Sequence, residues 1–325
     1  MLNPKMKRKE CYLAGILAAA AAISLLSGCC GGTPSLEEAL KKTASYEQTS
    51  IPSPASDSLG GEWTVIALAR SGEEAIDGYY EKYRANLEKR VKEQEGVLSE
   101  NRYTEYARAV LACKAIGIDP SDIGGYDLGK PLEDFEAVTA QGLNGAVYAL
   151  LALNADRLEI DGELEQKYLT YIVQQEKPSG GFSLDDSSDT ADVDLTAMTL
   201  QCLEPYATEE EISAIIDRGV EFLADAQAED GGYEAYGDKS SESVSQVILA
   251  LSTYGIDCNK DARFQKKEKG LYDNLMEYYK KDGSFSHILD GDSDPMATDQ
   301  AFCAMAAYSR FLNGKTSFYD MSDTN

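Results

Sequence analysis

Basic residues are scarce in this sequence, which has 30 lysines and arginines against 56 aspartates and glutamates and a formal net charge of −26. Such a chain repels phosphate backbones, so we expect no nucleic acid partner. Paired cysteines are missing too, because none of the seven cysteines has CxxC spacing, and this excludes a zinc ribbon. Hydrophobic residues make up an ordinary 43% of the 325 residues, which is enough for a sizeable core.

Long apolar runs are also lacking. Residues 13–26 form a run of 14 residues after a cluster of basic residues, which is short for a membrane span and typical of a signal-peptide core. The run ends in Leu26-Ser27-Gly28-Cys29, which resembles a bacterial lipobox. We therefore predict that residues 1–28 are a lipoprotein signal peptide and that Cys29 anchors the chain to the lipid bilayer, on the extracellular face of the bacterial cell membrane. Ordinary cleavage after small residues is the alternative.

Residues 29–60 contain Pro34, Pro52 and Pro54 and many serines and threonines. This composition predicts a flexible tether between the anchor and a folded domain. Ser35 is a suitable N-cap, so a short helix over residues 36–46 is expected within the tether.

After residue 60 the hydrophobic pattern is helical and shows no convincing alternation of period 2. Six stretches are apolar on more than one face, which predicts buried helices: 63–70, 103–116, 144–153, 194–203, 245–254 and 299–311. More polar, amphipathic stretches separate them and predict outer helices with one wet face: 79–95, 163–175, 209–227 and 271–281.

A short motif repeats in the second half of the chain, with its aromatic residues 51 and 52 positions apart. Its copies are Gly180-Gly181-Phe182, Gly231-Gly232-Tyr233 and Gly283-Ser284-Phe285, and Gly124-Gly125-Tyr126 is a looser one. The glycines allow a sharp turn after a helix, and the aromatic side chain can fill the seam to the next hairpin. We predict an all-α fold over residues 61–320, an α/α toroid of about six helical hairpins; an open solenoid is the alternative.

Two motifs carry a resemblance to a known family. Residues 218–223, Gln227 and Gly231-Gly232-Tyr233 resemble the repeat motif of squalene and oxidosqualene cyclases, with Tyr233 where that motif has tryptophan. The run Asp192-Val193-Asp194-Leu195 resembles the acidic motif of class II terpene cyclases. The chain is similar, over roughly residues 60–320, to the squalene cyclase and prenyltransferase repeat proteins of Gram-positive bacterial surfaces. The resemblance implies the toroid but does not fix the activity.

The resemblance implies one possible chemistry, cyclisation, in which Asp194 would protonate an alkene or epoxide beside Asp192. An alkene is a very weak base, so the acid must be strong and kept in a dry pocket. Leu195 stands where the family has a third aspartate. The aromatic lining that stabilises carbocations would come from Tyr106, Tyr148 and Phe302.

A structural explanation competes with this one. Matching the inner helices without gaps places Asn144, Asp194, Ser245 and Asp299 at equivalent positions, and all four are capping residue types. We therefore expect Asp194 to cap its helix or lie in its first turn. The row would also line one rim of the ring, so we expect a ligand cavity with contributions from Tyr106, Asn144, Tyr148, Ser245, Asp299 and Phe302.

Metal chemistry has little support. Prenyl transfer uses zinc held by aspartate, cysteine and histidine, but the only histidine is His287 and Asp192-x-Asp194 lacks the cysteine. We expect no metal and no cofactor. The acidic loops at 185–192 and 290–294 leave calcium open, although Pro295 replaces the glycine that an EF-hand requires.

The function expected is that of a membrane-anchored extracellular protein that binds a small molecule or a surface partner in its central cavity without catalysis. A class II terpene-cyclase-like enzyme with Asp194 as general acid is the alternative. The ligand, the oligomeric state and the disulfide state of four cysteines stay open.

Overall fold

The computed structural model describes residues 33–324 except 58, 157–160, 186–188 and 236. The predicted signal peptide and Cys29 lie outside the described residues and stay predictions. The folded unit described below is Ser35–Asn325.

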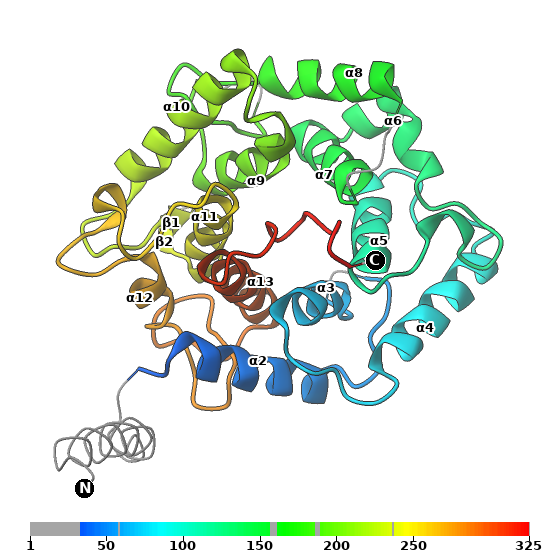
Figure 1. Ribbon diagram of the computed structural model, residues 1–325, viewed down its shortest axis with the longest axis horizontal. Helices are drawn as coiled ribbons and strands as arrows, with labels where there is room; N and C mark the ends of the chain where they lie inside the picture. Colours follow the sequence, from blue (N-terminus) through cyan, green and yellow to red (C-terminus); the bar gives the residue numbers. More distant parts are fainter. Residues whose placement is uncertain (1–32, 58, 157–160, 186–188, 236, 325) are drawn as a thin grey trace, which may run out of the picture. The chain divides into compact units, whose positions relative to one another are not determined.

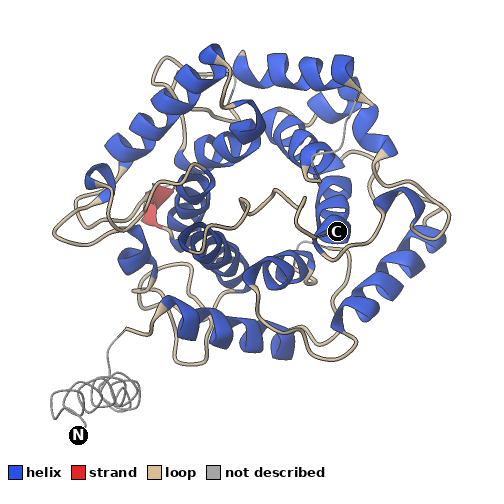
Figure 2. Ribbon diagram, in the orientation of Figure 1, coloured by secondary structure: helices blue, strands red, loops and turns tan. Residues whose placement is uncertain are grey.

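The folded unit is a double ring of helices, which confirms the predicted α/α toroid (Figure 1). The inner helices are α3 (Glu62–Ser71), α5 (Tyr103–Ala115), α7 (Leu143–Asn154), α9 (Val193–Leu203), α11 (Ser241–Thr253) and α13 (Pro295–Leu312). The outer helices are α2 (Leu36–Ser50), α4 (Tyr79–Glu93), α6 (Phe135–Thr139), α8 (Gly162–Val173), α10 (Glu210–Ala226) and α12 (Leu271–Leu275). Within the described residues, the named strands are β1 (Glu234–Ala235) and β2 (Asp238–Lys239), an antiparallel pair outside α11 (Figure 2).

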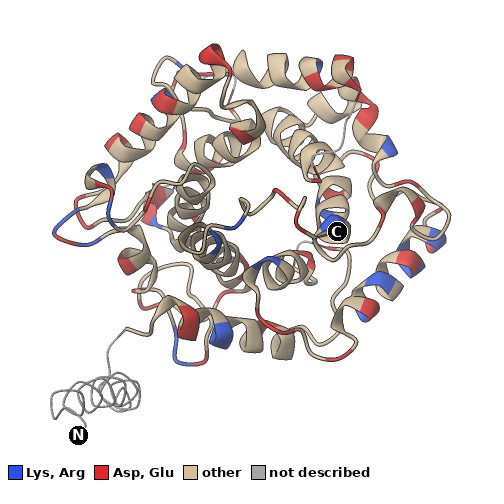
Figure 3. Cartoon of the chain, in the orientation of Figure 1, with Lys and Arg blue, Asp and Glu red and all other residues tan. Residues whose placement is uncertain are grey.

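Burial follows the two expected patterns. The outer helix α4 buries Tyr79, Tyr83, Leu87 and Val91, one residue per turn, and leaves its other faces wet. The inner helix α7 instead buries side chains on all its faces from Leu143 to Ala152. Acidic residues recur along the outer helices, for instance along α10 (Figure 3). Each inner helix packs against the next, and α13 packs against α3, so the ring is closed and not an open solenoid.

The repeated motif acts at the seams as predicted. Phe182, Tyr233 and Phe285 are fully buried. In two of the copies a threonine of the following inner helix accepts a hydrogen bond from the aromatic residue's own N–H, Thr196 from Phe182 at 2.9 Å and Thr298 from Phe285 at 3.0 Å. The looser copy differs, because the side chain of Tyr126 is 36% exposed.

The structure differs from the expected tether at residues 29–60. Ser35 forms a capping box with Glu38 and opens α2, which buries Ala39, Leu40 and Ala44 against the ring. The helix continues to Ser50 and packs against α13 and α3, so the folded unit begins at Ser35 and not at residue 61. The sequence did not indicate that this helix belongs to the folded unit, because its buried face consists mostly of small or polar residues and lacks a broad apolar stripe.

The four cysteines of the folded unit, whose disulfide state the sequence leaves open, are free and buried: Cys113, Cys202, Cys258 and Cys303. Among the described residues, no helix combines the length and hydrophobicity needed to cross a bilayer.

Candidate functional site

A cavity of about 280 Å³ lies inside the ring, toward the N-terminal ends of the inner helices. Its polar lining comes from the N-terminal halves of these helices: Thr104, Arg108, Asn144, Asp194, Gln246, Asp299 and Gln300. Its apolar lining includes Trp63, Tyr148, Met198, Leu249, Cys303 and Tyr319. An apolar cavity with a few converging polar groups is the usual form of a small-molecule site.

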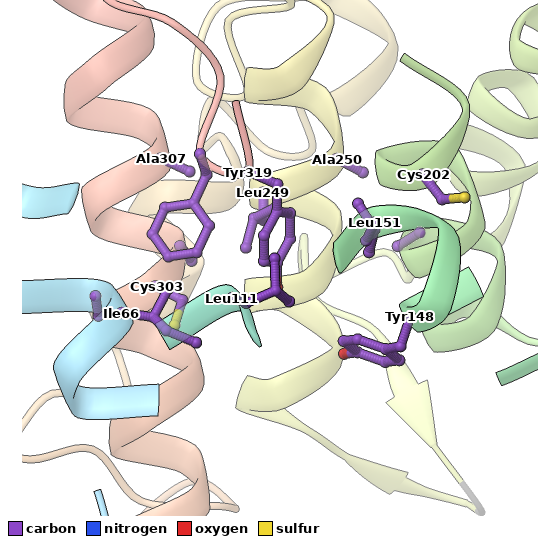
Figure 4. Packing of buried hydrophobic residues seen from close by; sticks show 14 of the residues in the cluster. Ile66, Leu111, Tyr148, Leu151, Cys202, Leu249, Ala250, Cys303, Ala307 and Tyr319 are labelled. Carbon is purple, nitrogen blue, oxygen red and sulfur yellow. The ribbon is translucent and has the colours of Figure 1, made fainter. Parts of the chain in front are cut away.

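The floor of the cavity is the C-terminal tail. After α13 the chain turns back and crosses the ring (Figure 1), and Tyr319 of this tail lines the cavity. Figure 4 shows the Tyr319 side chain among residues of the inner helices, with Tyr148 nearby. Burial raises the pKa of the Tyr319 hydroxyl well above its usual range, and Tyr148 and Cys303 add to the shift. The tail thus shuts the bore at the C-terminal ends of the inner helices.

Two arginines hold the tail in place. Arg70, at the end of α3, donates to the Phe318 carbonyl at 3.0 Å and to the Asp323 carboxylate at 2.6 Å. Arg310, near the end of α13, also donates to Asp323. Although burial alone would raise it, these hydrogen bonds lower the pKa of Asp323 to about 2. The Met321 N–H completes the attachment by donating to the Ala155 carbonyl at 2.6 Å.

Asp194 is the second residue of α9 and faces the cavity. The N-cap of this helix is Asp192, whose carboxylate accepts from the Leu195 N–H at 2.7 Å. Burial raises the pKa of Asp194, and the neighbouring carboxylates of Asp192 and Glu242 raise it further, while Ser243 opposes the shift. No hydrogen bond of ordinary geometry reaches Asp194 Oδ1, which is buried. The expectation of a first-turn position holds, but the capping role belongs to Asp192.

Asp299 belongs to a second acidic arrangement, at the point where the ring closes. Its carboxyl accepts a hydrogen bond from Thr64 at 2.9 Å, and the same hydroxyl lies 3.1 Å from the carboxyl of Glu47 on α2. Both acids are 2% exposed. Burial raises the pKa of Glu47 to about 7, and burial together with Glu47 raises the pKa of Asp299 well above its usual range.

The sequence model of one protein family, the prenyltransferase alpha-alpha toroid domain, matches residues 128–324, which is more than half of the chain. The chain belongs to this family. A comparison with curated proteins found no match. The toroid match covers the repeats from α6 onward and the whole C-terminal tail.

The inner helices begin at other positions than the sequence matching without gaps predicted. The N-caps of α9, α11 and α13 are Asp192, Ser240 and Asp294, at ten, seven and nine positions after the buried aromatic residue of each repeat. Asp194 lies two positions after its cap, whereas Ser245 and Asp299 lie five positions after theirs. Asn144 also lies two positions after its cap, Gly142, so the predicted equivalence holds within the pairs Asn144–Asp194 and Ser245–Asp299 and fails between them. The unequal loops, which matching without gaps ignores, explain the difference.

The structure brings together some of the predicted cavity residues and not others. Asn144, Tyr148, Asp194 and Asp299 line the cavity. Tyr106, Ser245 and Phe302 are buried but do not line it: the Tyr106 hydroxyl accepts from the Leu98 N–H at 2.9 Å, and the Ser245 hydroxyl donates to the Ser241 carbonyl at 2.8 Å, while Phe302 packs fully in the core. These corrections follow from helix rotation, which sequence periodicity does not fix where a helix is apolar all round.

Sequence reasoning missed Trp63, Arg108, Met198 and Tyr319 as lining residues. Trp63 had a signal, as the only tryptophan of the chain, and its ring lies 6.0 Å from that of Tyr148. Tyr319 had none, because it follows the last helical pattern.

The only histidine, His287, pairs with Glu242. Its Nδ1 lies 2.8 Å from Glu242, and this hydrogen bond raises the pKa of the imidazole. Across the described residues, no three histidine, cysteine, aspartate or glutamate side chains come together to hold a metal ion. Asp186 of the first acidic loop lies outside the described residues.

Proposed function

We propose that this toroid protein is anchored by lipidated Cys29 to the outer face of a bacterial membrane and binds a small molecule in its central cavity without converting it. The observation that carries the binding proposal is the cavity of about 280 Å³, which the C-terminal tail closes at one end. A closed floor gives a ligand a defined depth, as in a receptor pocket and unlike an open pore.

The state of Asp194 favours binding over cyclisation. Protonating an alkene requires an unusually strong acid, whereas burial and the neighbouring carboxylates raise the pKa of Asp194 and so weaken it. Leu195, where the cyclase motif has another aspartate, is a core residue with 1% exposure.

A cyclase-like enzyme remains the second candidate because Asp194 shares its cavity with Trp63, Tyr148 and Tyr319. Incubation of wild type and Asp194→Asn with linear polyprenes of several lengths separates the two proposals. A cyclised product made by wild type and missing from the variant would establish the enzyme.

Ligand binding is tested by native mass spectrometry of the purified full chain, followed by organic extraction of any bound compound. Met198→Trp should displace the ligand, because Met198 lines the cavity and tryptophan would fill part of it. Leu312→Trp is the control, at an exposed position outside the cavity lining. The same amount of bound compound in the two variants and in the wild type would overturn the proposal, and so would the absence of any bound compound in all three.

Anchoring is tested separately. Cys29→Ala should release the protein from the membrane fraction or leave it unprocessed, and unchanged fractionation and mass would contradict a lipid on Cys29.

A further inference from the structure

Charge in the central cavity is unevenly matched. Among its described lining residues the only cation is Arg108, and its Nε already donates to Glu62 at 2.9 Å, in a pair whose Glu62 side chain is 1% exposed. The two acids of the lining are Asp194 and Asp299, and among the described residues neither forms an ion pair with a lysine or arginine. The cavity is therefore short of positive charge.

Two hydrogen-bond acceptors of the lining are also poorly matched. The buried Oδ1 atom of Asn144 accepts no hydrogen bond, and the Ser243 hydroxyl beside the buried Oδ1 atom of Asp194 forms no hydrogen bond of ordinary geometry with it. The amide of Gln246, which also lines the cavity, donates one of its N–H groups to Gln300 at 3.1 Å. Two buried acceptors on neighbouring helices thus point to a ligand that brings N–H or O–H groups.

The apolar walls suit a cation too. Trp63 and Tyr148 lie with ring centroids 6.0 Å apart, and Tyr319 forms the floor. Faces of aromatic rings attract ammonium and guanidinium groups, and they also pack against an apolar body. The overall negative charge of the chain favours the approach of cations.

We propose, resting on the ligand binding proposed above, that the ligand is a small organic cation: an ammonium or amidinium group on an apolar or aromatic body. The cationic head lies between Asp194 and Asn144, and the body packs against Trp63, Tyr148 and Tyr319. The cavity volume of about 280 Å³ limits the ligand to a small molecule.

Three probes of similar shape test the charge preference: benzylammonium, benzyl alcohol and benzoate, titrated into the full chain by calorimetry. We expect benzylammonium to bind at least tenfold more tightly than benzyl alcohol, and benzoate to bind most weakly. Asp194→Asn should weaken benzylammonium at least tenfold and change benzyl alcohol less than twofold. Asp217→Asn, which removes an exposed carboxylate on α10, should change neither.

Each other result overturns the inference. Equal affinity for benzylammonium and benzyl alcohol would show a cavity that binds without selecting charge, and the proposed function would survive. Tighter benzoate binding would make Arg108 the receptor group. Absence of binding by all three would reject the cation, and native mass spectrometry of the same sample would decide the proposed function independently. If Asp194→Asn failed to fold, the ranking of the three probes by wild type would still decide.

Discussion

The two ends of the ring differ in how their buried polar groups are matched. At the C-terminal ends of the inner helices, Arg70 and Arg310 find acceptors throughout the tail. At the opposite end, Asp194 and Asn144 keep buried oxygens that accept no hydrogen bond of ordinary geometry. Groups matched inside the chain serve its stability, whereas unmatched ones cost free energy and are retained where a ligand completes them.

The largest effect is expected at the matched end. Arg70→Met removes a side chain that donates to five acceptors of the tail, at Thr316, Ser317, Phe318, Asp320 and Asp323. Breaking such a buried pair costs roughly 3–5 kcal/mol of the free energy of unfolding, measured by urea denaturation.

The matched control for this change is Arg218→Met, because Arg218 pairs with Glu176 on the surface, where its side chain is 51% exposed. It should cost about 1 kcal/mol or less. Equal losses in the two variants would mean that the tail is not held by its buried arginine.

A second test uses the acid pair at the ring closure. Because burial raises the pKa of Glu47 from 4.5 to about 7, the folded protein holds more protons than the unfolded chain between these values. The free energy of unfolding should therefore fall as the pH rises from about 4.5 to 7, by about 3 kcal/mol.

Glu47→Gln should flatten this pH profile and raise stability at pH 8. The control is Glu163→Gln on α8, because the Glu163 side chain is 81% exposed and pairs with Lys167 on the surface. This change should leave the profile as it is. A wild-type profile that rises from pH 4.5 to 7 would contradict the direction of the shift.

The ring closure itself can be loosened at Gly283. This residue has φ of 103°, and a Cβ there would lie 2.6 Å from the Lys42 carbonyl of α2. Gly283→Ala should cost about 1–3 kcal/mol, since both the backbone and a neighbouring helix must shift. Gly314→Ala, with φ of 63° and no atom within 4 Å of a Cβ, should cost about 1 kcal/mol from the backbone alone. Equal thermal shifts would show that α2 does not close the ring.

These tests also mark what the sequence could and could not predict. The inner helices were predictable because a helix that is apolar on all its faces is stable only in the core. The α2 helix was missed because it closes the ring through Thr43, which donates to the Gly283 carbonyl at 2.7 Å, and through small residues.

The site was less predictable than the fold for two physical reasons. Loop length shifts the register of each inner helix, so residues such as Ser245 and Asp299 fall one turn later than Asp194 relative to their caps. The floor residue Tyr319 comes from a tail without hydrophobic periodicity. The position of this tail depends on Arg310 and on Arg70, and Arg70 lies more than 240 residues before it in the sequence.

The smallest effect separates the two aspartates at the start of α9. Asp192→Ala removes the N-cap that accepts from the Leu195 N–H, and should cost about 1 kcal/mol. Asp194→Asn should change stability by only about 0.5 kcal/mol or less, because it removes a carboxyl whose buried oxygen has no donor. Binding of benzylammonium should reverse this order: Asp192→Asn, which keeps a capping side chain, should bind like wild type, while Asp194→Asn should lose at least tenfold. Urea denaturation and calorimetry on the same three variants check both halves. If Asp194→Asn were the less stable variant and bound the cation normally, Asp194 would serve the helix and the open end of the ring would be no different from the closed one.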